Sequence, residues 1–310
     1  MTSVVVGSHD DTHVLAVKKA IDELGGDPPF VVDAPSLLRD GFSVTLDAIT
    51  AGGKRIEFGR ADRGWLRRYA PPAWGTGLVA GSLEALSRRS FLALIGSIAR
   101  ISGVQWLTTL DALLAAEDKL FQLHTARHLG IPIPSTIIAS DPSVVTARLG
   151  EHFVVKPLSG GYYVSSTGPR VVFASALGDN EAELLSFADA PFLAQERIAT
   201  IKHLRVVTVR SRAWVCALGA EGRPLDWRQQ EEAHFAWTVA DDEEVCGRAL
   251  ALSSALGSGY SSQDWIRADD EAYFLDLNPG GQWLFLPHEV ASEVTRAIAS
   301  YLCGVSCEQA

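Results

Sequence analysis

The sequence predicts an α/β protein in which an open α/β domain is followed by two smaller α+β subdomains. A first apolar strand, Ser3–Gly7, precedes a segment with helical spacing of its apolar residues, Thr12–Leu24, which Gly25-Gly26 terminates. A second short strand follows at Phe30–Asp33, so the chain opens as β-α-β. With 310 residues, the chain is also longer than one average domain.

The first domain is predicted to span residues 1–115. We expect a hairpin in which Phe42–Thr45 pairs with Arg55–Phe58 around Gly52-Gly53. A stretch rich in proline and glycine, Pro71–Gly81, then leads into a long helix over about Ser82–Ile101.

Residues 116–190 and 191–310 are predicted to form the two further subdomains. A helix, Lys119–Leu129, opens the first of them and is stopped by a Gly-Ile-Pro-Ile-Pro run. The other predicted elements are, in order, strands Phe153–Pro157 and Arg170–Ala174, helix Asn180–Phe187, strands Phe192–Ile198, Leu204–Arg210 and Ala213–Leu218, helix Glu243–Leu256, strands Gln263–Arg267 and Tyr273–Leu277, and a closing helix from about His288.

Composition excludes several classes of function. With 27 basic and 37 acidic residues the formal net charge is −10, which argues against a nucleic-acid partner held by phosphate contacts. No uninterrupted apolar run of roughly 18 residues occurs, so we expect no membrane span. The beginning of the chain lacks the pattern of a signal peptide, so we expect the protein in the cytoplasm. The four cysteines are too few and too scattered for a disulfide framework.

Two lysines occupy positions that suit an anion. Lys119 opens a helix after an acidic pair, and Lys156 ends a very apolar strand. A lysine at the edge of a buried strand costs free energy unless an anion neutralises it or its stem carries the charge to solvent. The turn Leu158–Gly161 follows, and its backbone N–H groups suit phosphates. The Gly-Lys-Ser/Thr ending of a Walker A loop is absent.

The C-terminal part carries a set of oxygen ligands. Asp264 lies on one predicted strand, and Asp276 and Asn278 end the next. Alternation along a strand places Asp276 and Asn278 on one face, and a turn at Asp269-Asp270 makes Asp264 and Asp276 cross-strand neighbours. Two carboxylates and an amide oxygen suit Mg²⁺ completed by water and nucleotide phosphates.

Polar residues at the ends of other strands complete the pattern. Arg205 begins an apolar strand and Arg228 follows Asp226-Trp227, and either guanidinium suits charge on a transferred phosphoryl group. The run Gln195–Ile198 offers polar groups to an adenine edge and a ribose.

The order of these elements resembles the ATP-grasp superfamily, and within it the peptide-modifying ligases of the microviridin type, or graspetide synthetases. The closer resemblance rests on Lys156-Pro-Leu-Ser-Gly-Gly-Tyr, on Leu225-Asp-Trp-Arg228 and on Phe-Leu-Asp-Leu-Asn-Pro-Gly-Gly-Gln-Trp283. Trp65-Leu-Arg-Arg-Tyr69 is similar to a signature in the N-terminal part of related members. The resemblance covers residues 60–300, whereas residues 1–60 match only as an open α/β start.

The resemblance implies two subdomains that sandwich ATP, with ATP and Mg²⁺ as cofactors. It assigns the phosphates to Lys119 and Lys156, and the lid to residues 135–190. It assigns catalytic charge stabilisation to Arg205 and Arg228. The implied nucleotide-binding residues are completed by Gln195, Glu196, Arg197, Ile198 and His203, and the implied metal ligands are Asp264, Asp276 and Asn278.

The implied reaction is phosphorylation of an Asp or Glu carboxylate, followed by attack of a Ser/Thr hydroxyl or a Lys amine. The implied partner is a ribosomally made precursor peptide carrying those groups, and members are often homodimers. Three positions depart from the family pattern. Asp276 replaces the usual Glu, His203 replaces an Asp before the motif arginine, and Gly280 replaces Asn or Ala.

Two other functions remain open at the level of sequence. One is an amino-acid ligase that extends a protein terminus or a small molecule, and the other is a nucleotide-binding module without turnover, suggested by Asp276 and His203. His9 and His13 resemble metal ligands by composition, but their position after the first strand is also that of helix-capping residues.

Overall fold

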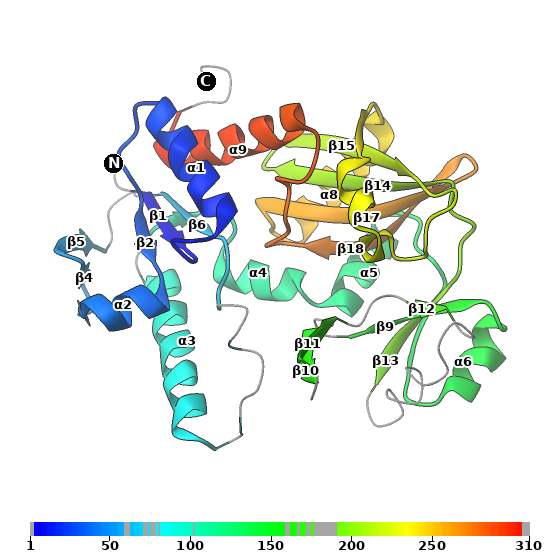
Figure 1. Cartoon of the computed structure of the whole chain (residues 1–310), viewed down its shortest axis with the longest axis horizontal. Helices are drawn as coiled ribbons and strands as arrows, with labels where there is room; N and C mark the ends of the chain where they lie inside the picture. Colours follow the sequence, from blue (N-terminus) through cyan, green and yellow to red (C-terminus); the bar gives the residue numbers. More distant parts are fainter. Residues whose placement is uncertain are drawn as a thin grey trace.

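The structure is a computed structural model that describes residues 3–58, 63–70, 74, 79, 81–101, 103–158, 162–165, 168–171, 175–176 and 191–305. In the N-terminal part, a parallel sheet has the strand order β2-β1-β6-β7 (Figure 1). Its strands are β1 (Ser3–Val6), β2 (Phe30–Val32), β6 (Arg63–Leu66) and β7 (Gln105–Trp106). Helix α1 (Thr12–Glu23) connects β1 to β2, which confirms the predicted β-α-β start. Every residue of β1 is buried, as expected inside a parallel sheet.

A small antiparallel sheet beside it corrects one prediction. Gly52-Gly53 joins β4 (Ala48–Ala51) to β5 (Lys54–Glu57), and β3 (Phe42–Val44) pairs with β4. The predicted pairing of Phe42–Thr45 with Arg55–Phe58 is therefore wrong, because β4 lies between them. The sequence gives little signal for β4, since this short strand carries only one large apolar residue. Both glycines have positive φ, as a two-residue hairpin turn requires. The sequence prediction also lacked helix α2 (Ala34–Asp40), whereas α3 (Leu83–Ile101) matches the predicted long helix.

The middle part forms an antiparallel sheet with the order β12-β9-β13-β8. Its strands are β8 (Thr136–Ala139), β9 (Phe153–Pro157), β12 (Ser175–Ala176) and β13 (Phe192–Glu196). Helix α6 (Pro142–Leu149) packs on this sheet through Val145, and β10 (Tyr162–Ser165) pairs with β11 (Gly168–Val171). The predicted helix Asn180–Phe187, the glycine turn at residues 159–161 and much of the predicted lid lie outside the described residues.

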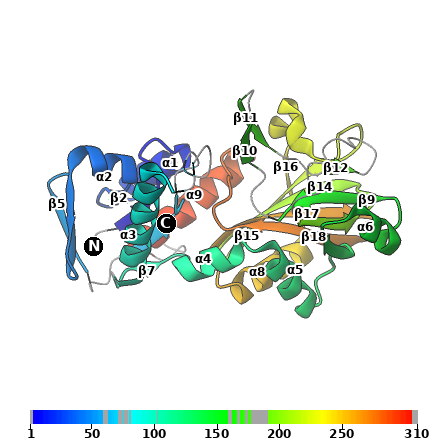
Figure 2. The same ribbon diagram turned by 90° about the horizontal axis from the view of Figure 1, so that it is seen from below.

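The C-terminal part is a five-stranded antiparallel sheet with the order β16-β15-β14-β17-β18. Its strands are β14 (Lys202–Val209), β15 (Arg212–Gly219), β16 (Thr238–Ala240), β17 (Tyr260–Ala268) and β18 (Glu271–Asn278). Helices α4 (Leu110–Ala116), α5 (Lys119–His128) and α8 (Glu243–Ala255) lie along one side of this sheet (Figure 2). Their apolar faces and the sheet enclose a core around Trp265 and Phe274, whose rings meet edge to face. No helix among the described residues is both long and apolar enough to cross a membrane.

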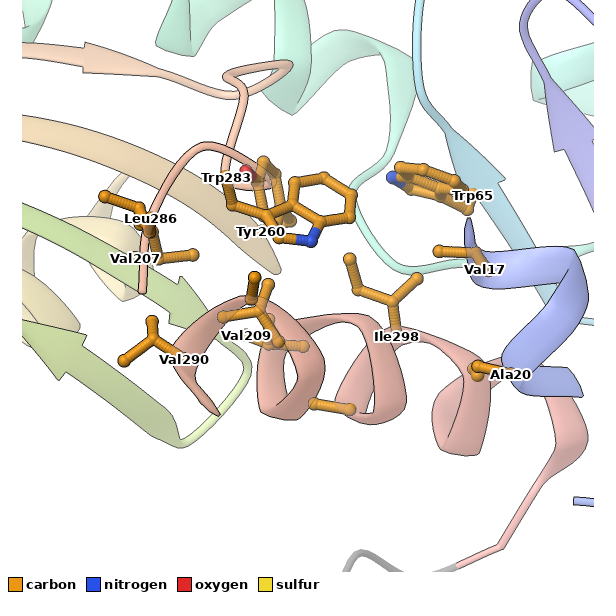
Figure 3. Close-up of a cluster of buried hydrophobic side chains, with 14 of the residues drawn as sticks. Val17, Ala20, Trp65, Val207, Val209, Tyr260, Trp283, Leu286, Val290 and Ile298 are labelled. Atoms are coloured by element: carbon orange, nitrogen blue, oxygen red, sulfur yellow. The ribbon is translucent and has the colours of Figure 1, made fainter. Parts of the chain in front are cut away.

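Helix α9 (His288–Cys303) joins the N-terminal part to the C-terminal sheet, because it packs against α1, β1 and β6 on one side and β14 on the other. The core that it covers contains Val17 of α1, Trp65 of β6 and Val207 of β14, with Trp283 at its centre (Figure 3). Since residues from both ends of the chain share this core, α9 holds the two parts in one packed unit.

The loop between β18 and α9 is held by the N-terminal part. Trp283 is fully buried, its indole N–H donates to Thr295 Oγ1 at 2.9 Å, and its backbone N–H donates to His13 Nε2 at 3.2 Å. Arg67, only 1% exposed, donates to the carbonyl oxygens of Gly280 and Gly281. Burial lowers the pKa of His13, which agrees with a neutral imidazole that accepts from Trp283. His13 is therefore occupied by packing contacts, and among the described residues no cluster of three or more His, Cys, Asp and Glu side chains suits a metal.

We predict that Trp283→Ala destabilises the folded protein by about 3–5 kcal/mol, because it empties the centre of the core shared by both ends of the chain. Calorimetric or urea unfolding measures the loss. Trp214→Ala is the control, since that ring is only partly buried beside the same core, and it should cost clearly less. Equal losses in the two variants would contradict the central position of Trp283.

Candidate active site

A cavity of about 680 Å³ lies between the middle sheet and the C-terminal sheet. Both sheets and the start of α5 line it. The predicted site residues that line this cavity are Lys119, Lys156, Gln195, Glu196, Arg197, Ile198, His203, Arg228, Asp264, Asp276 and Asn278. Arg205 instead lines a second cavity of about 480 Å³. The two cavities share Glu117, Trp227, Arg228 and Asn278, so they adjoin each other.

The two predicted metal-binding carboxylates are direct cross-strand neighbours. Asp264 of β17 is paired with Asp276 of β18, which confirms the predicted register. The register shifts just beyond this pair, because Trp265 pairs with Phe274 and leaves Leu275 as the extra residue of a β-bulge. With this extra residue in the strand, Phe274 is fully buried in the core and Asp276, two residues later, lines the cavity.

The charges around this pair favour a bound cation. Burial raises the pKa of Asp276, and repulsion from Asp264 raises it further. Burial would also raise the pKa of Asp264, but Arg205 and Arg228 outweigh it and hold that pKa below its ordinary value. Asn278 Oδ1 accepts a hydrogen bond from the Gly280 N–H at 2.9 Å, which orients the amide. Two opposed carboxylates and an oriented amide oxygen fit Mg²⁺, since a divalent cation would relieve the repulsion between the carboxylates.

Two half-buried lysine ammonium groups line the same cavity as the carboxylates. Lys156 Nζ donates to Gln195 Oε1 at 3.0 Å, and Lys119 Nζ donates to the Pro157 carbonyl at 2.6 Å. Burial lowers the pKa of both lysines, and the charge of Asp276 opposes that shift in each case. Ammonium groups in such a position favour an anionic ligand, and nucleotide phosphates have the charge and size to fill the cavity between them.

The predicted adenine-binding segment borders the same cavity, but one side chain is already engaged. Gln195 is buried, and besides accepting from Lys156 it donates to Thr136 Oγ1 at 3.1 Å. In this structure Gln195 therefore orients Lys156, and Glu196, Arg197 and Ile198 of the same predicted segment also line the cavity. Burial also lowers the pKa of His203, so this imidazole lines the cavity as a neutral group.

The two arginines are held differently. Arg228 binds Asp226 through two hydrogen bonds, of 2.7 and 2.6 Å, and these keep the pKa of Arg228 above its ordinary value although burial opposes its charge. Arg205 forms an ion pair with Asp264 and lies over the Phe285 ring. Its Nε atom is buried and has no hydrogen-bond partner among the described residues. A buried donor in that state is one that a ligand can satisfy.

Sequence reasoning missed Gln122, which fixes in place the strand that carries Asp276 and Asn278. Its side-chain amide donates to the Ala116 carbonyl at 2.6 Å and to the Leu277 carbonyl at 2.7 Å. Its oxygen accepts from the Leu277 N–H at 2.9 Å. Leu277 lies between Asp276 and Asn278, so the hydrogen bonds of Gln122 fix the position of the backbone that carries both residues. The signal in the sequence was a polar residue on the apolar face of a helix, beside Leu123 and Ala126.

Solved structures resemble the chain along almost its whole length. A RiPP-associated ATP-grasp ligase from Chryseobacterium gregarium, in complex with ADP and a leader and core peptide, is 19% identical with a TM-score of 0.83, over 98% of this chain and 97% of that one. The macrocyclase MdnC from Microcystis aeruginosa MRC, bound with precursor peptide MdnA, is 25% identical with a TM-score of 0.78, over 98% and 100%. The ATP-grasp ligase PsnB, complexed with a minimal precursor, is 22% identical with a TM-score of 0.74, over 98% and 99%.

No protein-family model and no curated protein matches the chain. The structural similarity nevertheless spans both partners almost completely, so it includes the N-terminal part as well as the two sheets that enclose the first cavity. The chain therefore has the ATP-grasp fold, as the order of its motifs predicted.

We predict that Asp264→Ala, Asp276→Ala and Asn278→Ala each abolish Mg²⁺-dependent turnover without unfolding the protein. Each change removes a predicted oxygen ligand from the strand pair that carries all three residues. The measurements are ADP release and the Mg²⁺ dependence of ADP binding by calorimetry. Asp276→Glu should keep activity, because it restores the usual family residue. Asp270→Ala, an exposed residue in the turn of the same hairpin, is the control. Full activity of Asp276→Ala would contradict the metal site.

We predict that Lys156→Ala raises the Kd for ADP and ATP roughly ten- to hundredfold, because a charge-assisted contact worth about 1.5–3 kcal/mol is lost. Lys156→Arg should restore only part of the affinity, since a planar guanidinium does not replace a compact ammonium. Titration calorimetry measures both, with the exposed Lys202→Ala as control. An unchanged Kd for Lys156→Ala would remove this lysine from the phosphate site.

Proposed function

We propose that the protein is an ADP-forming ATP-grasp ligase that uses ATP and Mg²⁺ to crosslink a ribosomally made precursor peptide through ester or amide bonds. One observation carries the proposal. Two carboxylates, Asp264 and Asp276, and two lysines, Lys119 and Lys156, line the same cavity, and arginines line a second cavity that adjoins it. The first cavity suits a nucleotide and its metal, and the second leaves room for the group that is phosphorylated. Full-length similarity to ligases solved with precursor peptides supports a peptide substrate.

Each part of the site has a role in this proposal. Lys119 and Lys156 hold the phosphates of ATP, and the segment from Glu196 to Ile198 borders the base. Asp264, Asp276 and Asn278 hold Mg²⁺, which supplies positive charge to the β- and γ-phosphates when it is bound. Arg205 and Arg228 stabilise negative charge that develops between the two cavities.

The proposed reaction has two steps, phosphorylation of a carboxylate and then acyl transfer to a nucleophile. A carboxylate oxygen of an Asp or Glu side chain attacks the γ-phosphorus, the bond from that phosphorus to the bridging oxygen of ADP breaks, and an acyl-phosphate forms. A Ser/Thr hydroxyl or a Lys amine then attacks the acyl carbon, the bond to the phosphate oxygen breaks, and phosphate leaves while the nucleophile loses a proton. Each bond therefore consumes one ATP and removes one water from the peptide.

The likeness to peptide-bound ligases favours a crosslinker over an amino-acid ligase, and the ligand set of the first cavity favours turnover over a passive nucleotide-binding module. We further propose that the enzyme acts in the cytoplasm, where ribosomal precursors are made, and as a homodimer, as the family resemblance implies. Light scattering on the purified protein tests the second point.

We predict that a short peptide encoded beside this gene, co-expressed with the protein, loses one water per crosslink without addition of any free amino acid. ADP and phosphate should accumulate in equal amounts. Mass spectrometry of the peptide and nucleotide analysis measure these outcomes, and Asp264→Ala is the inactive control. A mass gain of one amino-acid residue would favour the amino-acid ligase. Formation of AMP and pyrophosphate would contradict the acyl-phosphate route, because it requires attack at the α-phosphorus.

A further inference from the structure

The acyl-transfer step of the proposed reaction releases a proton, and some group must accept it. The hydroxyl or amine attacks the acyl-phosphate where the two cavities meet, and its proton is released there. The residues that line both cavities are Glu117, Trp227, Arg228 and Asn278. An indole and an amide are not bases near neutral pH, and Arg228 is a cation bound to Asp226. Among the described residues, Glu117 is therefore the one base at the junction.

The carboxylate of Glu117 is free to accept a proton. Its side chain forms no ion pair and no hydrogen bond with any described residue. It is exposed at the cavity wall, while the protein around it raises the pKa of the carboxyl group and no neighbouring cation opposes that shift. A carboxylate with a raised pKa holds a proton more strongly, which makes it a better general base.

Helix α4 gives no structural reason for an acid at this position. Glu117 is the C-terminal cap of the helix, where the negative end of the helix dipole disfavours a carboxylate. Asp111 of the same helix lies in the favourable first turn and also pairs with Arg100. Glu117 therefore has an unfavourable position and no stabilising partner among the described residues, which is typical of a functional residue.

The backbone beside Glu117 is tied to the strand that carries the predicted metal ligands. The side-chain amide of Gln122 donates to the Ala116 carbonyl at 2.6 Å and to the Leu277 carbonyl at 2.7 Å. Ala116 directly precedes Glu117, and Leu277 belongs to β18. One buried amide thus holds Glu117 at a fixed place relative to β18, as a base that must reach the reacting atoms requires.

We propose that Glu117 is the general base of the acyl-transfer step and accepts the proton of the attacking hydroxyl or amine. This inference rests on the proposed function. As the nucleophile bonds to the acyl carbon, its proton passes to a carboxylate oxygen of Glu117. The bond from the acyl carbon to the phosphate oxygen breaks, and phosphate leaves. Glu117 then gives the proton to the departing phosphate, directly or through water, and is restored for the next crosslink.

The test compares two products that share the phosphorylation step. The full-length protein is incubated with ATP, Mg²⁺ and the peptide encoded beside its gene, with and without hydroxylamine. Hydroxylamine attacks an acyl-phosphate as a neutral amine without help from a protein base and leaves a hydroxamate. The peptide's own nucleophile instead forms a crosslink. Mass spectrometry separates the products, because a hydroxamate adds mass to the peptide and a crosslink removes one water.

Glu117→Gln should slow crosslinking roughly a hundredfold or more, the usual contribution of a general base, and leave the rate of hydroxamate formation within about twofold of wild type. Glu117→Asp should keep part of the crosslinking rate. Formate should restore part of it in Glu117→Ala, because a small carboxylate can occupy the space of the missing side chain and accept the proton.

Two controls separate proton transfer from damage to the fold or the nucleotide site. Asp111→Asn changes an exposed acid of the same helix that lines neither cavity, and it should alter neither rate. The Kd for Mg²⁺-ADP and the thermal midpoint of Glu117→Gln should stay at their wild-type values.

Three outcomes would overturn the inference. The first is unchanged crosslinking in Glu117→Gln, and a selective loss in His203→Gln or His234→Gln would then assign the role to an imidazole that lines one cavity. The second is an equal loss of both products in Glu117→Gln, which would place Glu117 in the phosphorylation step. Both leave the proposed function intact. The third is absence of both products from the wild-type protein, which would count against the proposed function itself.

Discussion

Two half-buried carboxylates face each other across a strand pair, and the charges around them must balance. Asp264 and Asp276 occupy paired positions on β17 and β18, where burial makes an uncompensated negative charge costly. Arg205 and Arg228 compensate for Asp264, and Lys119 and Lys156 act on Asp276. These four cations come from α5, β9, β14 and the turn after β15, so the acidic pair requires every part of the ATP-grasp core to be in place.

The same constraint explains why the cavity suits a nucleotide. In the protein alone, the lysines donate to Gln195 and to the Pro157 carbonyl, which are neutral acceptors, and burial lowers the pKa of both. A cation on the carboxylates and phosphates on the lysines would give each charged group an opposite partner. Metal and nucleotide would therefore complement each other at this site, because the cation would add positive charge at the carboxylates and the phosphates would add negative charge at the lysines.

The structure shows what surrounds Gly280 and His203, two of the positions that depart from the pattern of the family that the sequence resembles. At Gly280, an added Cβ would lie 3.1 Å from the Arg67 carbonyl oxygen, so a larger residue there requires a shift of that backbone. Gly281 is still more restricted, because an added Cβ would lie 2.4 Å from the Ser262 Cβ. The N-terminal part is thus packed directly on the loop that follows Asn278. Burial lowers the pKa of His203, and the one ion pair of Arg205 among the described residues is with Asp264.

The sequence by itself determined the β-α-β start, the order of the site residues and the opposition of Asp264 and Asp276. These features depend on local rules, since strand alternation and a tight turn at Asp269-Asp270 fix which residues pair. Only the tertiary structure decided the bulge at Leu275, the amide contacts of Gln122 with β18 and the contacts of Arg67 and His13 with the loop before Trp283. Those contacts join residues more than 150 positions apart. They arise from the packing of separate elements, for which no spacing within one segment gives a signal.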